Sequence, residues 1–241
     1  MTQAVVVTGA AGGIGQALCE RAREDGYYVV GIDRRPVPAA DSEIQLDLGH
    51  SERLIEVGRE LARDYDIKAI VHNAAIQPIA KAGDTPLGEW TDALRVNVIA
   101  ADALVSGSRD SLAANDGSVV VISSVHGRAT TGGATAYATT KAALEGWVRS
   151  AALDLGPHIR VNAVAPGAID TAKLQEGFAR WGESSAKARK AVLLERTALH
   201  RIGEPREVAG AVSFLIGDDA RFITGSVLVV DGGATARLGS E

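Results

Sequence analysis

The sequence is poor in cysteine, with a single one, Cys19, among 241 residues. One thiol excludes an internal disulfide framework and a multi-cysteine metal site, so we expect no metal centre. The sequence also shows no charged and apolar leader at its start, and no apolar run long enough to span a bilayer. From these absences we expect a cytoplasmic protein that does not bind membranes.

Positive charge is likewise limited. The formal net charge is −5, and the basic clusters at 34–35 and 187–190 are short enough to be solvated surface. The basic face typical of a nucleic-acid binder is missing, so we expect no nucleic-acid partner. With 46% hydrophobic and 23% charged residues, the chain has the composition of a folded globular protein. No linker or repeat divides it, which predicts one domain over 1–241.

Short apolar runs alternate with longer segments of helical composition. The predicted strands are 4–8, 27–33, 43–46, 69–72, 118–123, 160–165 and 227–231. The predicted helices are 15–25, 51–65, 87–111, 136–155 and 204–216. Most of the strands are continuous Val/Ile runs, which indicates burial on both faces. The alternation predicts an α/β fold in which a doubly wound parallel sheet of about seven strands carries helices on both faces.

A glycine-rich turn, residues 8–15, joins the first predicted strand to the first helix. Glycine lets backbone N–H groups at a helix N-terminus approach a pyrophosphate. Asp33 ends the second strand, eighteen residues after Gly15. An acid at this spacing can hydrogen-bond an adenosine ribose, so the sequence predicts a Rossmann-like dinucleotide site.

The most specific pattern lies in the middle of the chain. Ser124 follows the predicted strand 118–123, and Tyr137 and Lys141 stand four residues apart at the start of a helix. That spacing places the ammonium on the same helix face as the phenol. A nearby positive charge lowers a tyrosine pKa, and a positioned phenol can exchange a proton with an alcohol or ketone oxygen. Ser124 can donate a hydrogen bond to that same oxygen.

Together these motifs resemble the short-chain dehydrogenase/reductase family, in its small single-domain branch, from about Thr8 to Gly233. The resemblance implies hydride transfer between a nicotinamide and a secondary alcohol or ketone. It makes Tyr137 the acid/base, Ser124 the carbonyl orienter and Lys141 the residue that lowers the tyrosine pKa and binds the ribose. Asn97 would complete the catalytic set through a proton relay that uses a backbone carbonyl of a kinked helix.

The resemblance also extends the cofactor site beyond Asp33. The residues that we expect to bind the dinucleotide are Gly9, Gly13, Ile14, Gly15, Asp33, Arg34, Asp47, Leu48, Asn73, Ala74, Ala75, Tyr137, Lys141, Pro166, Gly167, Ile169 and Thr171. Two positions depart from the family pattern, His72 in place of an asparagine and Ala75 in place of a glycine. We interpret His72 as a hydrogen-bonded structural residue rather than a proton donor.

Asp33 bears on the choice of cofactor. A carboxylate at the ribose repels a 2′-phosphate, which favours NAD over NADP, although Arg34 and Arg35 could hold such a phosphate. The leading hypothesis is an NAD-dependent dehydrogenase of a small secondary alcohol. An NADPH-dependent 3-oxoacyl-carrier-protein reductase shares the fold, but Asp33 and the net negative charge weigh against it. A non-catalytic NAD-binding regulator would not need all four catalytic residues.

The segment 167–203 is the least regular long stretch, and we interpret it as a substrate loop. We expect the small-molecule alcohol or ketone to contact Ser124, His126, Tyr137, Phe178 and Trp181. Thr130 and Thr131 add polar groups, which suggests a hydroxylated substrate such as a polyol, sugar or hydroxy acid. A second acid/base role for His126 is open, but we favour a substrate-contacting or merely exposed histidine. The family resemblance suggests a homotetramer built through the helices of Asn97 and Tyr137.

Overall fold

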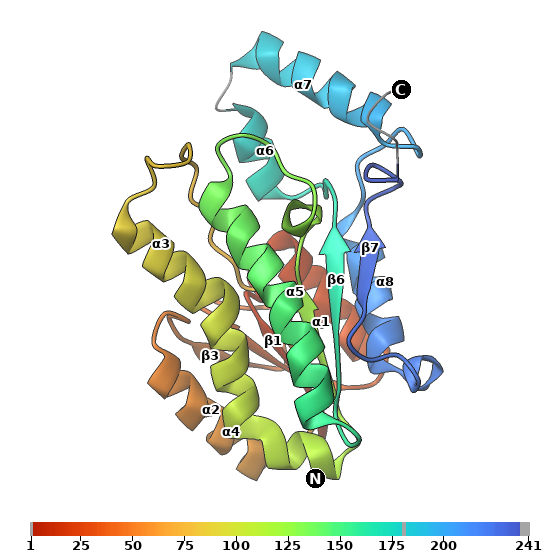
Figure 1. The fold of residues 1–241 in the computed structure, drawn as a ribbon. Coiled ribbons are helices and arrows are strands. Elements are labelled where there is room, and N and C mark those ends of the chain that lie inside the picture. The colour runs from red at the N-terminus through yellow and green to blue at the C-terminus, as the bar shows by residue number, and fades with distance from the viewer. Residues whose placement is uncertain (1, 180–181, 237–241) are drawn as a thin grey trace.

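A single parallel sheet organises the computed structural model, which describes residues 2–179 and 182–236 (Figure 1). The sheet has seven strands in the order β3-β2-β1-β4-β5-β6-β7, and every neighbouring pair is parallel. Chain order reverses between β1 and β4, the switch point where such folds bind ligands. The predicted Rossmann-like α/β fold is thereby confirmed.

The strands are short and apolar where they cross the centre of the sheet. Their bounds are β1 Gln3–Thr8, β2 Tyr28–Asp33, β3 Ser42–Gln45, β4 Asp66–His72, β5 Ser118–Ile122, β6 Arg160–Pro166 and β7 Val227–Val230. Every residue of β5 is buried, as expected for a strand covered on both faces. The edge strand β3 contains no buried residue, which explains its weak sequence signal.

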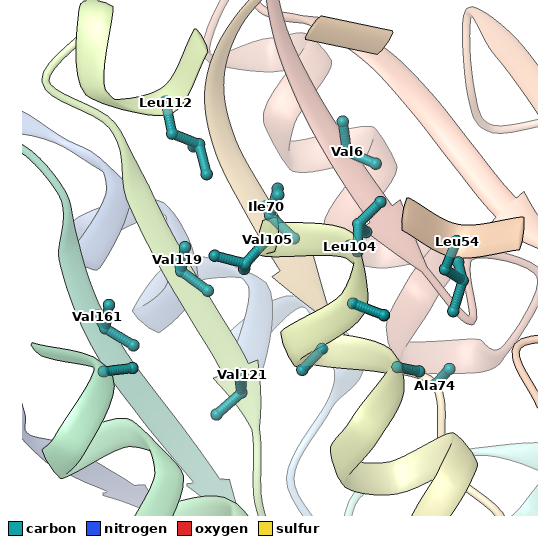
Figure 2. Close-up of a cluster of buried hydrophobic side chains, with 14 of the residues drawn as sticks. Val6, Leu54, Ile70, Ala74, Leu104, Val105, Leu112, Val119, Val121 and Val161 are labelled. Atoms are coloured by element: carbon teal, nitrogen blue, oxygen red, sulfur yellow. The ribbon is translucent and has the colours of Figure 1, made fainter. Parts of the chain in front are cut away.

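Helices cover both faces of this sheet. Their bounds are α1 Gly13–Glu24, α2 Ser51–Asp64, α3 Leu87–Leu94, α4 Ala100–Ala114, α5 Thr135–Leu155, α6 Ala172–Ala179, α7 Glu183–Arg196 and α8 Pro205–Ile216. Side chains of α2, α4 and α5 bury one face of the sheet, and those of α1 and α8 bury the other. Figure 2 shows the first of these cores, where Leu104 and Val105 of α4 pack toward Ile70 and Val119 of the sheet. Among the described residues no helix is both long and apolar enough to cross a membrane.

The predicted helix 87–111 is interrupted in the structure. A π turn, η1 (Arg95–Ile99), separates α3 from α4 while the chain continues in a helical path. In a π turn the hydrogen bonds run from residue i to i+5, and such turns occur frequently at functional sites. Composition predicted the helical path of this segment but does not report hydrogen-bond register. The kink at Asn97 that the family resemblance implies corresponds to this π turn.

The predicted substrate loop 167–203 is also more regular than expected. It contains α6 and α7, which lie beyond the carboxyl ends of the strands (Figure 1). The described side chains of both helices include no buried residue. Without a buried face these helices lack the apolar periodicity that would have predicted them.

Candidate active site

The glycine-rich turn closes against the neighbouring strand ends. Gly9 has a φ of +64°, and a Cβ there would lie 2.7 Å from the Cα of Ala74. A Cβ on Gly13 would lie 3.0 Å from the Cγ2 of Thr171. Helix α1 starts after Gly12 without a side-chain cap. The backbone N–H groups of its first turn, which includes Ile14 and Gly15, are therefore placed to bind an anion such as a phosphate.

Asp33 faces this turn from the end of β2. Its carboxylate accepts hydrogen bonds from the backbone N–H groups of Ala11, at 3.1 Å, and Arg35, at 3.0 Å. The side chain of Arg34 extends to Asp47, with 3.8 Å between Nη1 and Oδ2. Leu48, next to Asp47, is buried. The acid and the arginine that bear on cofactor choice thus lie at the same edge of the sheet.

Other expected cofactor residues follow the ends of β4 and β6. Asn73 donates from Nδ2 to the carbonyl of Gly9 at 2.9 Å, and Ala74 and Ala75 continue from it. Pro166 ends β6, where the N–H of Gly167 donates to Val230. Ile169 is buried, and Thr171 packs on the glycine turn. All the expected cofactor-binding positions therefore lie at the carboxyl edge of the sheet or on the helix of Tyr137.

Ser124 and Tyr137 come together just after β5. The side-chain oxygen of Ser124 accepts the N–H of His126 at 3.2 Å, at the start of the short helix η2 (Val125–Gly127). Tyr137 lies in the first turn of α5. Burial raises the pKa of Tyr137, and a hydrogen bond with Ser124 lowers it. Ser124 therefore lies close enough to lower the pKa of the phenol that we expect to act as acid and base.

Lys141 lies one helical turn after Tyr137, and its side chain is wholly buried. Its Nζ donates to the carbonyl of Ile122 at 2.7 Å and lies 5.6 Å from the centre of the Tyr137 ring. Burial, together with the positive charge of Lys173, lowers the pKa of Lys141 to about 7. The predicted lowering of the tyrosine pKa by Lys141 remains a prediction, since burial and Ser124 are the causes that act on Tyr137 here.

Asn97 occupies the π turn and is fully buried. Its Oδ1 accepts the N–H of Ile76 at 2.8 Å, and its Nδ2 donates both to the carbonyl of Ile76 and to Oγ1 of Thr140, each at 2.9 Å. The amide is thus fully engaged in joining the segment after β4 to helix α5. Any role of Asn97 in proton transfer falls to its backbone carbonyl, as the resemblance implies.

The expected substrate contacts are only partly brought together. The His126 ring meets the Tyr137 ring edge-on, with 5.7 Å between centres, and its Nδ1 is 2.8 Å from Oγ1 of Thr130. Burial lowers the pKa of His126, which favours its neutral form. Phe178 is half-buried on α6, and Trp181 lies outside the described residues.

Two further groups were not found from the sequence. Nζ of Lys173, on α6, lies 5.8 Å from the centre of the Tyr137 ring. Glu145 is buried and accepts hydrogen bonds from Ser123 Oγ and Arg128 Nε, both at 3.1 Å. The signal for Glu145 was present, because it follows Lys141 by four residues on the same helix face. A lone lysine after Thr171 carried no comparable signal.

The geometry fits a dinucleotide. An uncapped helix N-terminus beside a glycine turn suits a pyrophosphate, and a carboxylate at the end of β2 suits ribose hydroxyls. The buried ammonium and the phenol lie near the switch point of the sheet, at its carboxyl edge. Within the described part of the chain no cluster of three or more His, Cys, Asp or Glu side chains could hold a metal ion.

Several known proteins resemble this chain over nearly its whole length. Residues 9–235 match a family model described as Enoyl-(Acyl carrier protein) reductase. Protein FixR of Bradyrhizobium diazoefficiens is 34% identical over 249 residues, 95% of this chain and 85% of that protein. Cyclopentanol dehydrogenase of Comamonas sp. is 34% identical over 96% of both chains. Dehydrogenase/reductase SDR family member 4 of Rattus norvegicus is 32% identical over 97% of this chain and 87% of its own.

Solved structures agree closely with the fold. Ligand-free aldohexose dehydrogenase of Thermoplasma acidophilum has a TM-score of 0.93 at 32% identity, covering 100% of this chain and 96% of that one. A putative NAD(P)-dependent gluconate 5-dehydrogenase of Beutenbergia cavernae with bound NADP has a TM-score of 0.89 at 30% identity, covering 98% and 97%. 4-Hydroxyisoleucine dehydrogenase complexed with NADH has a TM-score of 0.87 at 27% identity, covering 98% and 100%.

The family match, the identity with dehydrogenases over nearly the whole chain and the shared fold lead to one conclusion. The chain belongs to the short-chain dehydrogenase/reductase family and is an oxidoreductase that acts on CH–OH groups.

Proposed function

We propose that this protein interconverts a small hydroxylated secondary alcohol and its ketone, with NAD as the dinucleotide. The observation that carries the proposal is the meeting of Ser124, Tyr137 and Lys141 just beyond the carboxyl end of β5. These three groups can orient an oxygen, exchange its proton and supply a positive charge beside it. When bound, the nicotinamide ring supplies the acceptor or donor of the hydride.

Tyr137 is the group that exchanges the proton. In alcohol oxidation the phenolate oxygen takes the hydroxyl proton of the substrate, and in ketone reduction the phenol returns it. Proton transfer by a positioned side chain is typically worth ~10²–10⁴ in rate. Because the backbone N–H of His126 already donates to the Ser124 oxygen, the Ser124 hydroxyl proton is available to point at Tyr137 or at the substrate oxygen.

Lys141 and Asn97 support the proton exchange by Tyr137. The Lys141 ammonium is held by the carbonyl of Ile122 on the side of Tyr137. We expect it to bind the ribose hydroxyls of the cofactor and to favour the phenolate form of Tyr137 through its charge. The hydrogen bonds of Asn97 to Ile76 and Thr140 keep the π turn against α5, the helix that carries both groups.

The preference for NAD rests on charge at the edge of β2 and β3. The Asp33 carboxylate faces the glycine turn, where a 2′-phosphate would meet like charge. Arg34, which could bind that phosphate, is turned toward the carboxylate of Asp47. Relatives with bound NADP and with bound NADH are both known, so this local arrangement, rather than the family, supports the choice.

Polar groups around Tyr137 support a hydroxylated substrate. The neutral His126 ring, the hydroxyl of Thr130 and the ammonium of Lys173 stand near the phenol. Such groups hydrogen-bond additional oxygens on a small ring or chain. The names of two similar proteins, cyclopentanol dehydrogenase and aldohexose dehydrogenase, support a small cyclic or sugar-like alcohol.

A second candidate is an NADPH-dependent reductase of acyl chains on a carrier protein. The description of the matching family model, which refers to an acyl carrier protein, favours it. The net charge of −5 disfavours it, because an acidic carrier docks best on a basic surface.

The two functions are separated by one assay. Reduced-nicotinamide absorbance is followed with NAD or NADP and a panel of cyclic alcohols, polyols, sugars and hydroxy acids. NAD-linked turnover that falls by about 10³-fold or more in Tyr137→Phe, with cofactor binding retained, is the expected result. Turnover confined to NADPH and 3-oxoacyl thioesters would favour the second candidate. Tight NAD binding without turnover on either panel would contradict both and indicate a regulator.

A further inference from the structure

His72 is the buried titratable group that the proposed chemistry does not use. It ends β4 next to the cofactor edge and has no exposed surface. Its Nδ1 lies 3.0 Å from Oγ1 of Thr8. Its Nε2 is a buried polar atom without a hydrogen-bond partner among the described residues. Buried polar atoms are nearly always paired in folded proteins, so this nitrogen requires an explanation.

The hydrogen bonds around Thr8 determine which ring nitrogen carries the proton. Oγ1 of Thr8 accepts the N–H groups of Asn73 and Ala74, both at 3.2 Å. Its single hydroxyl proton is then the one that joins it to His72, so Thr8 donates and Nδ1 accepts. Burial and the charge of Lys141 lower the pKa of His72 to about 3, which keeps the ring neutral. The one ring proton therefore resides on Nε2, as a buried donor.

Two backbone carbonyls of the π turn act on the His72 ring. Besides burial and Lys141, the groups that act on the His72 pKa are the backbone carbonyls of Val96 and Asn97, both of which raise it. Because Nδ1 is engaged by Thr8, we infer that these carbonyls lie on the Nε2 side of the ring. A switch from i+4 to i+5 hydrogen bonding changes the pairing of the helix carbonyls at the turn.

We propose that His72 is a positioning residue whose Nε2–H holds the carbonyls of the π turn. Because Nε2 has no partner in hydrogen-bonding geometry among the described residues, the contact closes through one enclosed water. This contact would fix the backbone of Asn97 relative to Lys141. In the proposed dehydrogenase, the proton path continues from Lys141 past this backbone. The functional consequence rests on the proposed function, whereas the hydrogen bond itself does not.

Two variants at position 72 distinguish the roles of the two ring nitrogens. His72→Asn keeps an acceptor near Nδ1 for Thr8 and loses the donor at Nε2, whereas His72→Gln places an amide donor near Nε2. In amide hydrogen exchange of the full chain, we expect faster exchange of residues 95–101 in His72→Asn and exchange close to the unaltered protein in His72→Gln. Helix α8, which covers the opposite face of the sheet from the π turn, serves as the internal control.

Kinetics then test the consequence for catalysis. We expect His72→Asn to lower kcat by about tenfold while KM and cofactor binding stay unchanged, on the scale of a small misplacement of reacting groups. His72→Gln should restore most of this loss, which a general loss of stability would not do. If the unaltered protein turns over no alcohol, the proposed function fails, and the exchange measurement still decides the hydrogen bond.

A third measurement uses the unaltered protein, so that its result does not depend on whether a variant folds. In the unaltered protein labelled with ¹⁵N-histidine, the expected spectrum shows one buried ring protonated at Nε2, with a proton that exchanges slowly with solvent. A ring protonated at Nδ1, a rapidly exchanging Nε2–H, or π-turn exchange that His72→Asn leaves unchanged would each overturn the proposal.

Discussion

At the residue scale, the centre of the site is a charge kept away from water. Lys141 is buried beside a second ammonium, Lys173, and these two causes lower its pKa to about 7. A buried lysine costs folding free energy whenever it must be protonated. Such a group is retained for function rather than for stability, which makes its removal a direct test of the site.

The cost predicts a pH-dependent stability difference for Lys141→Met. The unfolded lysine has a pKa near 10.5 and the folded one near 7, so between these values only the unfolded chain binds the proton. The penalty in the unaltered protein is complete below pH 7 and fades as the pH rises toward 10.5. We expect the variant to unfold at a higher temperature at pH 6, by a few degrees or more, with a smaller gain at pH 10.

Thermal unfolding of both proteins at the two pH values measures this difference. An equal gain at pH 6 and pH 10 would show that packing, and not the buried charge, separates them. The variant should also lose turnover, since Met carries no charge to act on Tyr137. Stability and activity would then change in opposite directions at one residue, as expected at a site where burial is used for chemistry.

At the element scale, the segment after β5 is held at both of its ends. The carboxylate of Glu145, on α5, accepts two hydrogen bonds from this segment. One comes from Ser123 Oγ, just before Ser124 in the sequence, and the other from Arg128 Nε, just after the short helix η2. The side chain of Glu145 is 5% exposed, whereas that of Arg128 is 55% exposed. An exposed ion pair contributes little stability, but removing the partner of a buried carboxylate leaves that charge poorly compensated.

We therefore expect Arg128→Ala to loosen the segment that carries Ser124 and His126. The predicted result is a fall in kcat of about three- to tenfold with cofactor binding unchanged, because only the oxygen-orienting side of the site moves. Arg53→Ala is the matched control, since Arg53 forms exposed ion pairs with Glu56 and Glu60 on α2. Steady-state kinetics of both variants test this expectation. An equal fall in kcat in the two would contradict a role of the Arg128–Glu145 ion pair in holding the segment of Ser124 and His126.

The elements also show how much of the structure could be predicted from the sequence alone. Apolar runs such as 118–122 predicted the strands, and the spacing of Tyr137 and Lys141 predicted that the two side chains share a helix face, because burial and helical periodicity leave marks on residue choice. The π turn of Asn97 left no such mark, since its residues suit an α-helix equally well. The contacts of Lys173 and Arg128 depend on how distant segments meet, which one sequence does not record.

At the scale of the whole molecule, two groups of exposed apolar side chains lie on different elements. One lies on α3 and the π turn, where Leu87, Leu94 and Ile99 are exposed. The other lies at the β7 edge, where Phe222 is fully exposed and Leu228 partly so. Figure 1 shows α3 and β7 on opposite sides of the molecule. A tetramer with closed twofold symmetry needs two different self-complementary surfaces, and these regions supply two.

We predict that the chain forms a homotetramer through these two surfaces. Four copies of a 25.0 kDa chain give a mass of about 100 kDa, which light scattering or native mass spectrometry measures. Leu87→Asp and Phe222→Asp should each yield dimers, because each places a charge in only one of the two interfaces. The double variant should be a monomer. A monomeric unaltered protein would contradict the assembly, and single variants that remain tetrameric would show that these surfaces are not the interfaces.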